Sequence, residues 1–142
     1  MARLILFASG SGTNVENIIR YFKNHPDIEI ISVCCNNPRA YVIQRAKNHQ
    51  IPVFIFNRAD FYESDRVLQY LRSSEADWII LAGFLWLLPE NIVRAFEKRI
   101  VNIHPALLPA YGGKGMYGMR VHQAVIDAGE KESGITIHRS EE

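Results

Sequence analysis

Short apolar runs rich in β-branched residues alternate with amphipathic segments along almost the whole chain. Six runs have the length and composition of buried strands, at residues 3–8, 28–35, 51–56, 77–82, 99–103 and 134–138. Five segments between and beside them have helical spacing or helical character, at residues 15–23, 38–49, 62–73, 89–98 and 121–128. This alternation predicts an α/β fold, with a mostly parallel, twisted sheet and helices on both faces.

The length of the chain indicates one domain. Its 142 residues fit a single core, and they contain no internal repeat, low-complexity segment or linker. We therefore predict a single domain over residues 1–142. Only four residues follow the last predicted strand, so we expect this domain to be C-terminally incomplete and to lack a covering helix. The apolar face left open would favour a homodimer.

Composition narrows the classes of partner. The formal net charge of +1 argues against a nucleic acid or an acidic membrane as partner. No apolar run is long enough to cross a bilayer and no basic leader precedes the first strand, so we expect a cytoplasmic protein that acts on small molecules. Cys34 and Cys35 are adjacent and lack metal-ligand spacing, which predicts reduced thiols in a strand and no metal.

A glycine-rich loop, SGSGTN, lies between the first predicted strand and the first predicted helix. At such a junction the unpaired backbone N–H groups and the helix dipole favour an anion. The loop lacks the Gly-Lys-Ser/Thr of a Walker loop and the full spacing of a dinucleotide fingerprint, so a monophosphate fits it best. The alternative is a plain turn in which Thr13 or Asn14 caps the helix.

Asn102 and His104 stand at the carboxyl end of the fifth predicted strand, where ligands bind in α/β proteins. They are two residues apart, so on an extended backbone their side chains project from the same face. An amide and an imidazole in this arrangement suit the polarisation and protonation of a small polar substrate. The alternative is that His104 only satisfies a hydrogen bond within its loop.

Five segments carry a family resemblance when they are taken in order, namely SGSGTN, LAGFLWLLP, VNIHPALLPAYGGKGMYG, VHQAV and ESGITIH. Together they resemble the phosphoribosylglycinamide formyltransferase family, from the first strand to His138. The resemblance implies a formyltransferase-type parallel sheet. It also implies transfer of a formyl group from the co-substrate 10-formyltetrahydrofolate to the amino group of glycinamide ribonucleotide, a step of purine biosynthesis.

The resemblance implies roles for individual residues. Asn102 and His104 match the catalytic pair, which stabilises the developing oxyanion and moves a proton to the folate nitrogen. Four residues match the segment that holds the ribonucleotide phosphate, namely Gly12, Thr13, Asn14 and Val15. Folate contacts are implied for Leu85, Trp86, Leu87, Leu88 and Asn102, and Arg58 matches a folate-contacting arginine only loosely. The alternative for Trp86 is a place in the core.

The chain also departs from the family pattern. The family's third catalytic residue is an aspartate beyond ESGITIH, and neither Glu141 nor Glu142 is expected to replace it, because chain ends fray. Arg120 stands where some members have a histidine near the substrate. We therefore expect this chain to be less stable than a complete member and weak or inactive in catalysis.

Two other functions stay open. One is a formyltransferase of the same fold that acts on another amine, on a charged tRNA or a sugar nucleotide. A tRNA partner would need a basic surface, against which the net charge of +1 argues. The other is an inactive remnant that binds the ribonucleotide without turnover.

Overall fold

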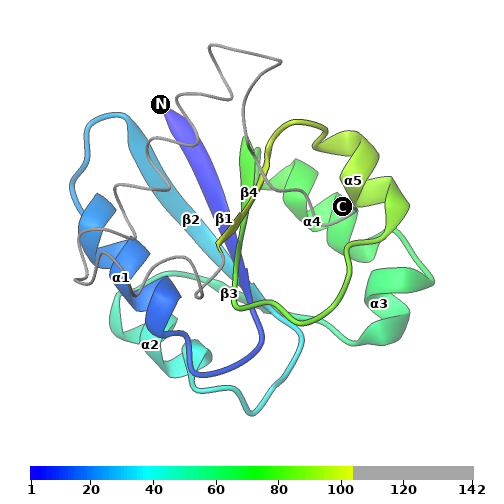
Figure 1. The fold of residues 1–142 in the computed structure, drawn as a ribbon, viewed down its shortest axis with the longest axis horizontal. Helices are drawn as coiled ribbons and strands as arrows, with labels where there is room; N and C mark the ends of the chain where they lie inside the picture. The colour runs from blue at the N-terminus through cyan, green and yellow to red at the C-terminus, as the bar shows by residue number, and fades with distance from the viewer. Residues whose placement is uncertain (104–142) are drawn as a thin grey trace.

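Five parallel strands form the central layer of the protein, for which a computed structural model describes residues 1–103 (Figure 1). The strands are β1 (Ala2–Ala8), β2 (Ile28–Cys35), β3 (Val53–Ile55), β4 (Trp78–Ala82) and β5 (Ile100–Ile103). They lie in the order β3-β2-β1-β4-β5, and every neighbouring pair is parallel. The predicted α/β fold is confirmed. The helix and strand predicted at residues 121–128 and 134–138 lie outside the described residues.

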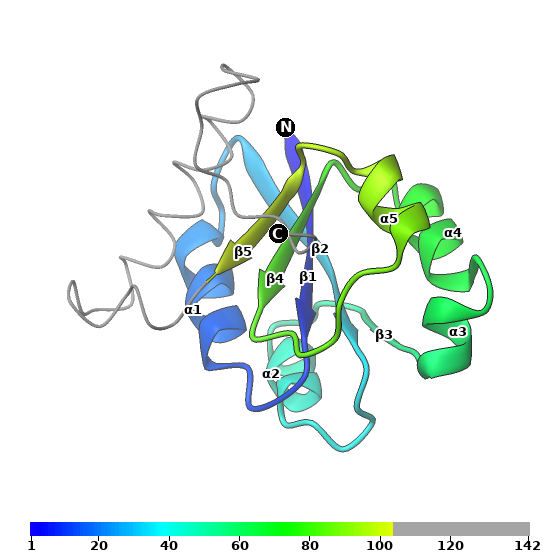
Figure 2. The ribbon, with the colours of Figure 1, turned by 45° about the vertical axis from the view of Figure 1, so that its right-hand side comes forward.

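Helices cover both faces of this sheet (Figures 1 and 2). One face carries α1 (Thr13–Phe22) and α2 (Val42–Asn48). The other face carries α3 (Arg58–Tyr62), α4 (Arg66–Ser73) and α5 (Glu90–Ala95). Because both faces are covered, the central strands are apolar on both sides, which explains their continuous hydrophobic runs.

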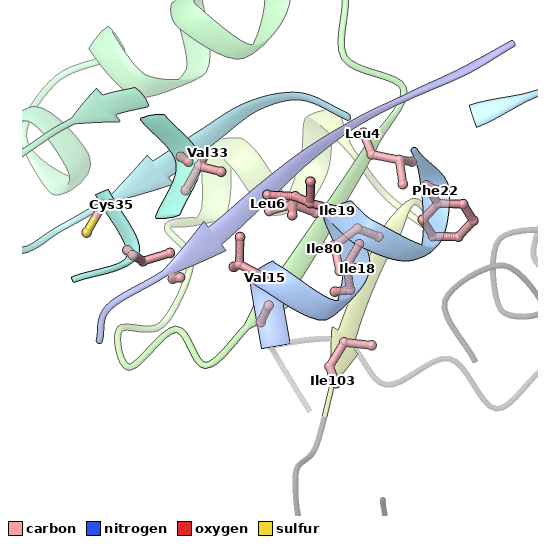
Figure 3. Close-up of a cluster of buried hydrophobic side chains, with 14 of the residues drawn as sticks. Leu4, Leu6, Val15, Ile18, Ile19, Phe22, Val33, Cys35, Ile80 and Ile103 are labelled. Atoms are coloured by element: carbon pink, nitrogen blue, oxygen red, sulfur yellow. The ribbon is translucent and has the colours of Figure 1, made fainter. Parts of the chain in front are cut away.

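The core beneath α1 has the helical face that the spacing predicts. Val15, Ile18, Ile19 and Phe22 are all buried and point toward the strands (Figure 3). Below them lie alternate residues of the central strands, among them Leu4, Leu6 and Ile80. The intervening residues of the same strands form a second core under α3, α4 and α5. Alternation along each strand therefore supplies both cores.

The helix predicted at residues 62–73 is confirmed over α4, but its predicted start is wrong, because Tyr62 is the last residue of a separate helix, α3. A capping box starts α3 early: the side chain of Asn57 accepts from the N–H of Asp60, whose carboxylate accepts from the N–H of Asn57. Ser64 then breaks the helix, because its hydroxyl donates to the Asp60 carbonyl and accepts from the N–H of Arg66. Local side-chain hydrogen bonds thus decide the boundary.

We expect Leu6→Ala to lower the free energy of unfolding by about 2–5 kcal/mol, because Leu6 is fully buried and its truncation leaves a cavity. Leu85→Ala is the matched control, since Leu85 is 82% exposed, and it should change stability by less than about 0.5 kcal/mol. Urea denaturation followed by circular dichroism measures both. Equal losses in the two variants would contradict the assignment of the core.

Candidate functional site

The strand order reverses between β1 and β4, which are neighbours at the centre of the sheet. The arrowheads of β1, β4 and β5 all point to the lower part of Figure 2, and the loops that follow β1 and β4 leave the sheet there. In open parallel sheets, ligands bind at the carboxyl ends of the strands at such a reversal. The topology therefore places the candidate site where these two loops meet.

Ser9 joins the two loops. Its backbone N–H donates to the carbonyl of Gly83 at 3.1 Å, and its hydroxyl oxygen accepts from the N–H of Leu85 at 2.9 Å. Ser9 is only 7% exposed, so water competes little for these hydrogen bonds. The loop after β1 and the loop after β4 are consequently held as one unit. Ser9 was not among the predicted site residues, although it begins the SGSGTN motif.

The first loop ends in a left-handed glycine at the start of α1. Gly12 has φ +80° and is the N-cap, and Thr13 is the first residue of the helix. No side chain caps this end, so the alternative in which Thr13 or Asn14 caps the helix is wrong. The first-turn N–H groups therefore stay available to an anion. Val15 is fully buried in the core, so its side chain is not available to a ligand.

Gly12 also lies too close to α2 for any side chain. A Cβ atom built at Gly12 would lie 2.4 Å from Cγ2 of Val42, whereas one at Gly10 would meet nothing within 4 Å. The φ of +80° at Gly12 further disfavours any residue with a Cβ. Two requirements, conformation and space, thus converge on this one glycine of the loop.

Glu16 lies in the first turn of α1 and connects it to α2. Its carboxylate accepts from Arg20 Nε at 2.6 Å, lies 2.8 Å from His49 Nε2 and lies 3.7 Å from the guanidinium of Arg45. Burial favours the neutral carboxyl, but the hydrogen bonds and charges of His49 and Arg20 outweigh it and hold the pKa of Glu16 below its usual range. The carboxylate is therefore ionised and surrounded by basic groups.

The loop after β4 alternates between inward and outward side chains. Leu85 and Leu87 are 82% and 71% exposed, whereas Leu88 is buried and Trp86 packs against the core under α3. Tyr62 of α3 fastens this loop by donating its hydroxyl to the Leu87 carbonyl at 2.6 Å. The outward leucines form an apolar surface on a loop whose inner side is anchored.

Arg58 is the first residue of α3, and its guanidinium lies over the ring of Trp86 at 4.8 Å and that of Tyr62 at 5.1 Å. Both distances are typical of cation–π contacts. The same guanidinium borders a cleft of about 520 Å³ at the ends of β2 and β3, which Asn36 and Arg66 also line. The structure therefore brings Arg58 together with the predicted folate segment.

Asn36 is a polar residue of this cleft that the sequence prediction missed. Its Oδ1 atom is buried and has no hydrogen-bond partner among residues 1–103. Buried polar atoms without partners are uncommon, so an unpaired oxygen beside a cleft is typical of a ligand site. The only signal in the sequence was the polar pair that follows β2.

Asn102 is half-buried on β5, an outer strand of the described sheet, and pairs with Leu81 of β4. Val101 and Ile103 contribute to the core beneath α1, so the alternating pattern directs Asn102 to the opposite face, which carries α3, α4 and α5. This places it one strand away from the point where the loop after β4 begins. His104 follows β5 directly and lies outside the described residues.

The described residues also bear on the expectations about thiols, metal binding and membrane spans. Cys34 and Cys35 are free and buried as predicted, and burial raises the pKa of both thiols. Within residues 1–103 no group of three or more His, Cys, Asp or Glu residues is arranged to hold a metal ion. None of the helices in the described part of the chain has the length and hydropathy needed to span a membrane. The expected homodimer and cytoplasmic location stay predictions.

An α/β sheet with paired loops at its reversal point is typical of proteins that bind ligands at the carboxyl edge. The family model described as "Formyl transferase" matches residues 2–142, and the chain belongs to this family.

Relatives and solved structures agree with this family. The chain is 42% identical over 143 residues to "Phosphoribosylglycinamide formyltransferase, chloroplastic" of Vigna unguiculata, covering 96% of this chain and 45% of the relative. It is 36% identical to "Phosphoribosylglycinamide formyltransferase" of Bacillus subtilis, covering 100% of this chain and 73% of the relative. The crystal structure of glycinamide ribonucleotide transformylase 1 from Geobacillus kaustophilus aligns with a TM-score of 0.69 and 39% identity, covering 87% and 68% of the two chains.

This chain covers a different fraction of the length of each relative. The chain spans about half the length of the plant proteins that it matches, 45% and 49%.

We expect Gly12→Ala to destabilise the protein by about 1–3 kcal/mol, because the new Cβ meets Val42 and the residue keeps a left-handed backbone. Gly10→Ala is the matched control, since its Cβ would enter open space. Thermal and urea unfolding of the two variants measure the difference. A Gly12→Ala protein as stable as Gly10→Ala would contradict the close approach of Val42 to Gly12.

Proposed function

We propose that this chain transfers a formyl group from 10-formyltetrahydrofolate to the amino group of glycinamide ribonucleotide. The observation that carries the proposal is the junction at Ser9, which joins the loops after β1 and β4 at the reversal point of a formyl transferase sheet. One loop offers backbone donors to an anion, and the other offers an apolar surface. Two dissimilar ligands can therefore meet between them.

The ribonucleotide phosphate belongs at the start of α1 in this proposal. Backbone N–H groups of Gly12, Thr13, Asn14 and Val15 would hold it, aided by the helix dipole. The support is the left-handed Gly12 and the absence of any side-chain cap at this end of α1. The basic groups around Glu16 balance its carboxylate, which would otherwise repel a phosphate.

The folate belongs on the loop after β4. Leu85 and Leu87 would supply apolar contacts, and the backbone of the same loop would supply hydrogen bonds to the pteridine ring. Trp86 and Leu88 pack against the core under α3, α4 and α5 and so fix the position of this loop. Arg58, held over Trp86, places a cation beside this surface for an anionic part of the folate.

The chemistry follows from Asn102 and His104. The amine nitrogen of the ribonucleotide attacks the formyl carbon, and the bond from that carbon to the folate nitrogen breaks. The Asn102 amide would donate a hydrogen bond to the formyl oxygen as negative charge develops there. His104 would move the proton from the attacking amine to the departing folate nitrogen.

We expect the chain to show slow but measurable formyl transfer between these two substrates. Asn102→Ala should lower kcat about 100- to 1000-fold, because one oxyanion donor is lost, and His104→Ala should lower it at least about 100-fold. Asn48→Ala is the matched control and should keep the full rate, since Asn48 is exposed and, among residues 1–103, its side chain bonds only to Gln44 on the same helix. A spectroscopic assay of folate release measures all four proteins.

Three outcomes separate the proposal from its rivals. Equal rates in the wild type, Asn102→Ala and His104→Ala would contradict the assigned roles. Binding of glycinamide ribonucleotide without any transfer would identify an inactive ribonucleotide-binding protein. Transfer to a charged tRNA but not to the ribonucleotide would identify a formyltransferase that acts on another amine.

A further inference from the structure

Helix α2 holds two consecutive carbonyl groups of the loop after β1. The N–H of Val42 donates to the carbonyl of Gly10 at 3.1 Å. Nε of Arg45 donates to the carbonyl of Ser11 at 2.7 Å. Arg45 is 34 residues from Ser11 in sequence, so this contact exists only because the fold packs the start of α2 against the loop.

These two carbonyls set the direction of two N–H groups. Both peptide bonds are trans, and in a trans peptide the carbonyl and the following N–H point in opposite directions. Because the carbonyls of Gly10 and Ser11 face α2, the N–H groups of Ser11 and Gly12 point away from it. Neither N–H has a hydrogen-bond acceptor among residues 1–103. Gly12 is buried, and a buried N–H without an acceptor is uncommon unless a ligand supplies one.

The side chain of Arg45 is itself held from two sides. Its guanidinium lies over the ring of Tyr41 at 5.0 Å and within 3.7 Å of the Glu16 carboxylate. His49 Nε2 lies 2.8 Å from the same carboxylate and ties the end of α2 to α1. An arginine with several donors in a planar group can contact a carbonyl and a carboxylate together, which a lysine cannot do with the same geometry.

We propose that Arg45 is a positioning residue for the anion end of the site: through the Ser11 carbonyl it aims the Gly12 N–H at the phosphate of the ribonucleotide. The inference deepens the proposed function and rests on it. Arg45 contacts the Ser11 carbonyl on the side of the loop that faces α2, so it acts on the phosphate through the backbone and not by direct contact. Its loss should therefore weaken binding of the phosphate-bearing substrate and leave folate binding unchanged.

The test compares Arg45→Gln and Arg45→Lys with the wild type in the 142-residue chain. Calorimetry should show a dissociation constant for glycinamide ribonucleotide that rises about five- to tenfold in Arg45→Gln, the effect of one lost hydrogen bond to the loop. Arg45→Lys keeps the charge and should show a smaller rise. The dissociation constant for 10-formyltetrahydrofolate should stay the same in both variants.

A second readout observes the N–H groups directly. In a ¹⁵N-labelled wild-type sample, titration with inorganic phosphate should shift the amide signals of Ser11 and Gly12. In Arg45→Gln these two shifts should shrink. Arg94→Gln is the matched control, because within the described residues Arg94 pairs only with Glu90 on α5 and is largely exposed, and it should behave as the wild type.

The outcomes distinguish this inference from the proposed function. Unchanged ribonucleotide binding and unchanged amide shifts in both Arg45 variants, in a chain whose wild type binds and transfers formyl, would overturn the role of Arg45 alone. Equal weakening of ribonucleotide and folate binding would show a general structural role and would also overturn it. A wild type that neither binds the ribonucleotide nor shifts with phosphate would overturn both.

Discussion

The rest of the proposed site depends on the two hydrogen bonds of Ser9, a buried residue that directly follows β1. Ser9 donates to Gly83 and accepts from Leu85, so one small residue closes the loop after β1 against the loop after β4. Without this junction the uncapped start of α1 and the exposed leucines would be independent features of the surface. With it they are two halves of the proposed site at the reversal point of the sheet.

The two helical layers contribute differently to that site. The α1–α2 layer sets the anion end, because Val42 and Arg45 hold the loop carbonyls and Val42 excludes any side chain at Gly12. The layer of α3, α4 and α5 sets the apolar end, because aromatic packing around Trp86 and the hydroxyl of Tyr62 fix the loop after β4. Each half of the proposed site is thus held by the hydrophobic core on its own face of the sheet.

Sequence reasoning predicted the features that depend on local pattern. The buried face of α1 follows from helical spacing, and the five described strands follow from their apolar runs. It failed where short-range hydrogen bonds compete, as at Ser64, which separates α3 from α4 and moves the start of the helix predicted at residues 62–73. It also missed contacts between distant segments, such as Arg45 with Ser11, since no spacing rule connects residues 34 apart. The roles of Asn102 and His104 stay predictions from the family resemblance.

A crystal structure of this chain with glycinamide ribonucleotide tests the central claim most directly. We expect the phosphate to lie at the first turn of α1, within hydrogen-bond distance of backbone N–H groups from Gly12 to Val15. We also expect the amino group of the ligand to point toward Asn102. A phosphate bound elsewhere, with the start of α1 unchanged, would contradict the assignment of the anion to this helix end.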